Sequence, residues 1–155
     1  MTITVFVDST ETRAYFSRLE GRLRDMRTPN RQASRALERL VLAGFDRQQT
    51  PWGTRWRSLK KSTKRLRRLA GYAEGPALRA SGYLRASIRS AYGRTGFSVE
   101  ASAAYADFHQ NGGIGFHGSV VPARPYMPIR RGAVSLPQPW WDAVLEPFNE
   151  LARKP

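Results

Sequence analysis

The pattern of apolar residues over residues 29–48 is the feature that most limits how this chain can fold. Six residues share one helical face: Ala33, Leu37, Leu40, Val41, Gly44 and Phe45. Arginines occupy the opposite face, so the spacing predicts an amphipathic helix. Thr28 and Pro29 suit its start, with the threonine as the cap. Pro51 and Gly53 prevent the helix from continuing, and a turn is expected there.

Helices are also expected in three other segments of the chain. An apolar stripe predicts a helix over residues 10–26, and a second stripe predicts a terminal helix over 139–152, which Pro147 would kink or shorten. A short helix is expected over 103–110.

Alternation of apolar and polar residues predicts the strands. Residues 2–7 alternate, and residues 88–92 and 97–101 alternate on either side of a glycine-containing turn, which is typical of a hairpin. Strand fragments are expected near 120–121 and 126–129. The order of elements predicts an α+β fold, in which a small antiparallel or mixed sheet packs against one or two long N-terminal helices and a C-terminal helix is added.

The length of 155 residues suits a single domain, residues 1–155, with mobile segments expected near 50–77 and 111–119. The chain has no cysteine, so disulfides, thiol nucleophiles and cysteine metal sites are excluded. No apolar run approaches the roughly 20 residues that cross a bilayer, and the first residues lack a basic leader. We therefore expect no membrane partner and assembly in the compartment of synthesis.

No catalytic constellation can be named. His109 and His117 lie eight residues apart across a glycine-rich loop, which is poor spacing for a metal pair. The glycines at 112–115 lack the lysine of a phosphate-binding loop. The twelve carboxylates form no evident pair for acid–base or two-metal chemistry. The sequence thus predicts a protein that is not an enzyme and holds no metal and no cofactor.

The strongest compositional signal is the formal net charge of +14. It is concentrated in one segment without an acid: Arg55, Arg57, Lys60, Lys61, Lys64, Arg65, Arg67 and Arg68. Such a segment can contact a polyanion or an acidic protein surface, or can simply be solvated. Trp52 and Trp56 flank the segment and are expected to anchor the turn, with Leu66 and Leu69 as its later apolar anchors. A free nucleic-acid-binding protein is the alternative function that this segment leaves open.

Three motifs, in order, give the chain a resemblance. The first comprises Phe45, Gln49, Pro51, Gly53, Trp56, Leu59, Lys60 and Thr63. The second comprises Leu78, Ser81, Gly82, Leu84, Ser87 and Ile88. The third comprises Tyr105, Ala106, His109, Gln110, Gly112 and Gly113, followed by Val121, Pro122, Ala123, Arg124 and Pro125. Together they resemble the virion morphogenesis family of tail-completion proteins in Mu-like and related tailed phages.

The resemblance implies a structural role in the virion. Such a protein acts in the neck or at the head-proximal end of the tail, after assembly in the host cytoplasm. The expected partners are further copies of the chain in a ring, hexameric by analogy with related families, neighbouring neck and tail-tube proteins, and DNA in the neck channel. Tail completion, tail termination and head closure remain open alternatives at this point.

A ring also suggests which residues meet neighbours. The candidates are Trp52, Gly53, Trp56, Tyr105, His109, Gln110, Gly112, Gly113 and Arg124. Prolines near Arg124 stiffen its backbone, so this arginine is predicted either to hydrogen-bond a neighbouring subunit or to be an ordinary surface residue.

Overall fold

The computed structural model describes residues 10–115 and 118–153, and the strand predicted at 2–7 lies outside these ranges. The elements are α1 (Thr10–Leu23), α2 (Arg27–Arg47), α3 (Lys61–Leu69), α4 (Tyr83–Ala86), β1 (Ile88–Tyr92), β2 (Phe97–Ala101), α5 (Ala106–Asn111), β3 (Gly113–Ile114), β4 (Val120–Val121), β5 (Ile129–Arg130), β6 (Ala133–Val134) and α6 (Gln138–Arg153). The predicted α+β class is confirmed.

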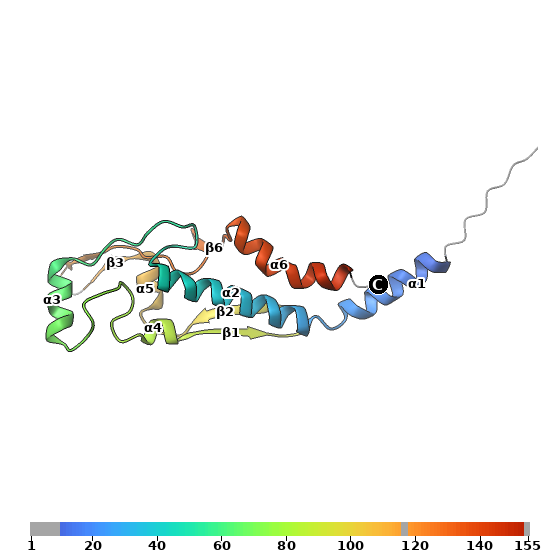
Figure 1. Cartoon of the computed structure of the whole chain (residues 1–155), viewed down its shortest axis with the longest axis horizontal. Coiled ribbons are helices and arrows are strands. Elements are labelled where there is room, and N and C mark those ends of the chain that lie inside the picture. Colours follow the sequence, from blue (N-terminus) through green and yellow to red (C-terminus); the bar gives the residue numbers. More distant parts are fainter. Residues whose placement is uncertain (1–9, 116–117, 154–155) are drawn as a thin grey trace, which may run out of the picture.

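Helix α2 is the axis of the molecule. The hairpin β1–β2 packs along one side of it and α6 along another, while α1 extends beyond its N-terminal end (Figure 1). The predicted hairpin is confirmed, with Ile88 opposite Ala101 at one end and Tyr92 opposite Phe97 at the other. All strand pairs of the described residues are antiparallel and two-stranded, so no mixed sheet is found there.

The start of α2 differs from the prediction. The helix begins at Arg27, so Thr28 lies inside its first turn and does not cap it. The carboxylate Oδ1 of Asp25 instead accepts a hydrogen bond from the backbone N–H of Arg27, at 3.1 Å. Asp25, three residues before Thr28, thus satisfies one of the backbone N–H groups that the start of a helix leaves free.

Helix α2 ends as Pro51 and Gly53 require. Gln48 takes the left-handed conformation, with φ of 55°, and its side-chain amide donates to the carbonyl oxygens of Phe45 and Ala77, at 2.7 and 3.1 Å. The chain then turns through Gly53, whose φ of +83° is readily adopted by glycine. This turn sends the following segment back along the body of the protein.

Three aromatic rings form the centre of the core. The ring of Phe45 lies 5.4 Å from that of Trp56, edge to face, and 5.4 Å from that of Tyr126. The indole Nε1 of Trp56 donates to the carbonyl oxygen of Pro125 at 2.9 Å, and the hydroxyl of Tyr126 donates to that of Ala106 at 3.1 Å. The prediction that Trp56 anchors the turn is confirmed.

Two local predictions were wrong. Leu66 and Leu69 do not anchor the basic segment, because they are 66% and 75% exposed. The glycine-rich segment after α5 is not wholly a loop, since β3 pairs with β4. Gly112 permits this pairing, because a Cβ there would lie 2.6 Å from the backbone nitrogen of Ala123.

In the part of the chain that the structure describes, no helix combines the length and the apolar character needed to cross a bilayer.

Burial predicts a sharp contrast between two leucines. Leu84 is 2% exposed and belongs to the core, so Leu84→Ala is expected to lower the free energy of unfolding by about 2–5 kcal/mol through lost burial and a cavity. The same change at the exposed Leu69 is expected to alter it by less than about 0.5 kcal/mol. Urea unfolding of both variants measures the difference, and equal losses would contradict the packing described above.

Candidate assembly surface

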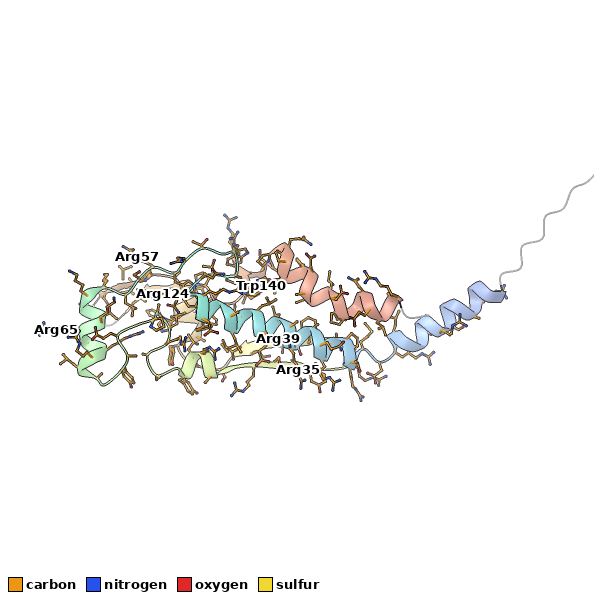
Figure 2. All side chains as sticks on the ribbon, in the orientation of Figure 1. Arg35, Arg39, Arg57, Arg65, Arg124 and Trp140 are labelled. Carbon is orange, nitrogen blue, oxygen red and sulfur yellow. The ribbon has the colours of Figure 1, made fainter. Side chains whose placement is uncertain are left out.

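The basic segment divides between two elements. Arg55, Arg57 and Lys60 lie on the loop after the turn, and the other five cations lie in or at the start of α3. No residue of α3 is buried. Figure 2 shows Arg65 on this helix at one end of the molecule. The helix therefore presents charge, and the two exposed leucines, to its surroundings.

Short polar contacts hold α3 to the loop that follows. The guanidinium Nη1 of Arg67 donates to the carbonyl oxygens of Gly75 and Pro76, at 2.9 and 3.0 Å. Arg68 forms an exposed ion pair with Glu74. Exposed pairs of this kind contribute little stability, so α3 is weakly supported from within its own subunit.

A groove of about 460 Å³ opens between α3, α5 and β4. We call it the cationic groove, because its charged lining residues are Arg57, Lys60, Arg67 and Arg124, together with His109. Its apolar lining residues are Leu59, Leu66, Leu78, Phe108, Val120, Val121 and Pro122. The groove thus combines positive charge with apolar walls.

Arg124 lies in the wall of this groove and not on the open surface. Arg124 is only 5% exposed, and its Nε and Nη2 atoms donate to the carbonyl oxygen of Arg57, at 3.1 and 2.9 Å. The alternative of an ordinary surface residue is wrong, because the loop at Arg57 folds over Arg124. The hydrogen bond to a neighbouring subunit stays a prediction. Arg57 and Arg124 are labelled close together in Figure 2.

Within the part of the chain that the structure describes, acids do not pair with the main charges around the cationic groove. No ion pair of the described residues involves Arg57, Arg67 or Arg124. Burial lowers the pKa of the Arg124 guanidinium, and the charges of Arg67 and Arg57 lower it further. Burial also lowers the pKa of His109, followed by the charges of Arg124 and Arg67. The buried Nδ1 of His109 has no hydrogen-bond partner among the described residues.

Two further interface candidates serve the subunit itself. Trp56 is 7% exposed within the core, and Gln110 is 6% exposed. The side-chain oxygen of Gln110 accepts hydrogen bonds from the backbone N–H groups of Tyr126 and Met127, both at 3.0 Å. Gln110 therefore fixes the path of the segment that carries the core tyrosine, a role that its sequence neighbours did not reveal.

The other candidates lie at or near the surface. Trp52 is half-buried under the guanidinium of Arg130, 3.8 Å from the ring centre, and Gly53 is exposed. Tyr105 is 40% exposed, with its ring between those of Tyr83 and His109. Gly112 and Gly113 allow close backbone packing against Ala123 and against the ring of Phe108. The structure brings Tyr105 and His109 together, and leaves Trp52 and Gly53 in a separate region.

Helix α6 exposes a stripe of acids that the sequence analysis did not predict as a functional surface. Asp142, Glu146 and Glu150 recur every fourth residue on α6 and are all exposed, as are Trp141 and Leu145 beside them. The four-residue spacing is the signal that identifies such a stripe on a helix. No group of three or more potential metal ligands occurs within residues 10–115 and 118–153.

A model of the phage virion morphogenesis family matches residues 7–135 of this chain. The chain belongs to this family. No curated protein and no solved structure matches it significantly.

Residues from each of the three motifs of this phage virion morphogenesis protein lie in its core. Trp56, Leu84, Ile88 and Ala106 all belong to the main apolar cluster, and Gln110 bonds the backbone beside it. The motifs that carry the resemblance therefore describe how the subunit folds. The surfaces by which it meets other virion proteins must be sought among the exposed residues.

The hydrogen bonds of Gln110 predict a large loss of stability on truncation. Gln110→Ala leaves two buried backbone N–H groups unsatisfied, so the free energy of unfolding is expected to fall by about 2–4 kcal/mol. The control is Asn111→Ala, which removes an exposed hydrogen bond to Asp107 and is expected to change it by less than about 0.5 kcal/mol. Denaturant titration distinguishes the two, and a harmless Gln110→Ala would refute the assignment.

The lowered pKa of His109 predicts a pH dependence of stability. The unfolded chain binds a proton at this residue near pH 6.5, whereas the folded chain binds it only at lower pH. The stabilisation is complete above about pH 6.5 and is lost as the pH falls toward the folded pKa, at no more than about 1.4 kcal/mol per pH unit. Unfolding midpoints of wild type and His109→Gln at pH 8 and pH 5.5 test this. The variant should lose less stability on acidification, and an equal loss would exclude His109 as the cause.

Proposed function

We propose that this phage virion morphogenesis protein is a structural subunit of the joint between head and tail, which completes the tail or neck by assembling as a ring, and that it catalyses no reaction. Family membership supplies the setting. The observation that carries the proposal is the number of large apolar side chains that the described residues leave exposed: Leu23, Leu66, Leu69, Tyr72, Tyr83, Tyr92, Tyr105, Ile114, Val120, Ile129, Val134, Trp141 and Leu145.

These side chains are spread over several elements of the subunit. Leu66 and Leu69 lie on α3, and Trp141 and Leu145 lie on α6. A second groove, of about 350 Å³ and mainly apolar, lies between α2, β2, β5, β6 and α6. Contiguous exposed apolar surface is typical of protein interfaces. A subunit with more than one such surface suits an assembly in which it has several neighbours.

The strand pairs support the same conclusion. Each sheet of the described residues has only two strands, so every strand keeps one edge unpaired. Isolated two-stranded sheets are marginally stable, and free edges pair readily with other chains. Neighbouring subunits of a ring, hexameric as expected from the resemblance, would supply the missing partners.

For the alternative function, free nucleic-acid binding, the exposed cations are available but the tryptophan rings are not available for base stacking. Trp56 is enclosed in the core, and one face of Trp52 is covered by Arg130. Stacking of bases on aromatic rings gives single-strand binders much of their affinity. Contact of this chain with DNA would therefore depend on the exposed cations alone, which suits a channel lining better than an independent binder.

Deletion of the gene in its phage tests the proposed function. We expect full heads and finished tails that are separate in electron micrographs, with infectivity restored by the gene in trans. Tails of irregular length would point to termination of the tail, and heads that lose their DNA would point to head closure. Infectious virions of normal appearance would contradict the proposal altogether.

A further inference from the structure

Among the described residues, no acid forms an ion pair with Arg57, Arg67 or Arg124 of the cationic groove. Arg124 is almost wholly buried, and its hydrogen bonds within the subunit go to a neutral carbonyl oxygen, that of Arg57. Arg57, Arg67 and His109 line the same groove. Buried charges in proteins are ordinarily paired, because an unpaired one is costly to remove from water. The groove is therefore suited to receive an acid, which residues 10–115 and 118–153 of its own subunit do not supply as an ion pair.

The walls of the cationic groove indicate what kind of acid fits. Leu59, Leu66, Phe108 and Val121 form much of the lining. A nucleic-acid backbone offers phosphates in a hydrated sugar chain and gains nothing from apolar walls. A protein segment can place a carboxylate beside an apolar side chain, and it would use both parts of the groove. The lining thus favours an acidic and apolar protein surface over DNA.

Helix α3, at the edge of the groove, also needs a cover. It is nine residues long, has no buried residue and exposes Leu66 and Leu69. Helices of this length are marginal in water without tertiary packing. A partner that covers the leucines and neutralises the neighbouring cations would stabilise α3 in both ways.

The chain itself carries a matching surface on α6. The exposed acids Asp142, Glu146 and Glu150 are spaced four residues apart, and Leu145 is 41% exposed beside them, whereas Trp141 is turned toward the second groove, which it lines. Within the subunit these acids have only weak partners, since Glu146 lies 3.6 Å from the exposed Arg153 and Asp142 accepts from Gln138. Charge and apolar character therefore match the cationic groove.

We propose that the outward face of α6 of one copy docks into the cationic groove and against α3 of the next copy, so that its carboxylates neutralise the groove. The two surfaces are different and lie toward different ends of the subunit (Figure 1). The contact is therefore head-to-tail, and repetition about an axis closes a ring. This contact rests on the proposed function, because it names the joint by which that ring would be built.

The absence of cysteine makes this contact easy to test by cross-linking. Ser62 lies on α3 and lines the groove, and Asn149 lies on the exposed face of α6. The double variant Ser62→Cys/Asn149→Cys, treated with a short bis-maleimide in solution and in complemented phage particles, is expected to give a ladder of linked subunits. The control Ser62→Cys/Ser17→Cys, with its second cysteine on α1, is expected to give none.

The pattern of bands decides the arrangement. A ladder that extends beyond the dimer supports head-to-tail docking, because each copy then links to two others. Bands that stop at the dimer would overturn it, since they indicate a two-fold contact. No excess over the control, in solution and in particles, would overturn it as well.

Charge reversal tests the chemistry of the contact. Asp142→Lys/Glu146→Lys is expected to weaken self-association by about tenfold or more, because both carboxylates would become cations facing the groove. Mixing it with Arg57→Glu/Lys60→Glu, which reverses two exposed groove residues, is expected to restore association. The control Glu20→Lys/Glu100→Lys makes the same change of net charge away from α6 and should leave association unchanged. Sedimentation velocity measures all of these.

The outcomes separate this inference from the proposed function. If wild type assembles and Asp142→Lys/Glu146→Lys assembles equally well, the docking is wrong while the ring remains. If Arg57→Glu/Lys60→Glu abolishes salt-sensitive DNA binding and leaves assembly intact, the groove serves DNA and the docking is wrong. If gene deletion leaves infectious virions, the proposed function fails independently of either result.

Discussion

The contact of Phe45 with Trp56 and Tyr126 is the interaction on which the rest of the structure depends. Phe45 ends the buried face of α2, Trp56 follows the turn that reverses the chain, and Tyr126 comes from the C-terminal half. One aromatic cluster thus joins three segments that are distant in sequence. It also determines the position of the loop at Arg57, which in turn covers Arg124. The cationic groove exists because this cluster forms.

Local patterns were enough to predict most of the elements. The end of α2, the hairpin of β1 and β2 and the terminal helix follow from spacing and from turn residues, which act over a few positions. The aromatic anchor at Trp56 was predicted for the same reason, since Pro51 and Gly53 force the turn beside it. These features need no knowledge of the rest of the chain.

The site was harder to predict, because it depends on contacts between distant segments. Nothing near Arg124 in sequence shows that the carbonyl of Arg57 will reach its guanidinium, or that Gln110 will bond the backbone of Tyr126. Leucine is usually buried, which predicts Leu66 and Leu69 as anchors, but α3 has no buried residue in the structure. The spacing of the acids on α6 can be read from the sequence, but the groove that we propose as their partner is formed by contacts between distant segments.

In the contact proposed above, the cationic groove with α3 and the outward face of α6 are two different surfaces on separate parts of the subunit. An open chain of such subunits always leaves one groove and one α6 face unoccupied at its two ends. Only closure into a ring brings these two surfaces together. The final contact of a circle is therefore formed without recruiting another molecule, which makes the closed form far more durable than any open arc. The number of copies would follow from the angle between the α6 face and the groove. A slight change in the tilt of α6 against α2 would therefore alter the circumference of the ring and its fit to the part of the virion on which it sits.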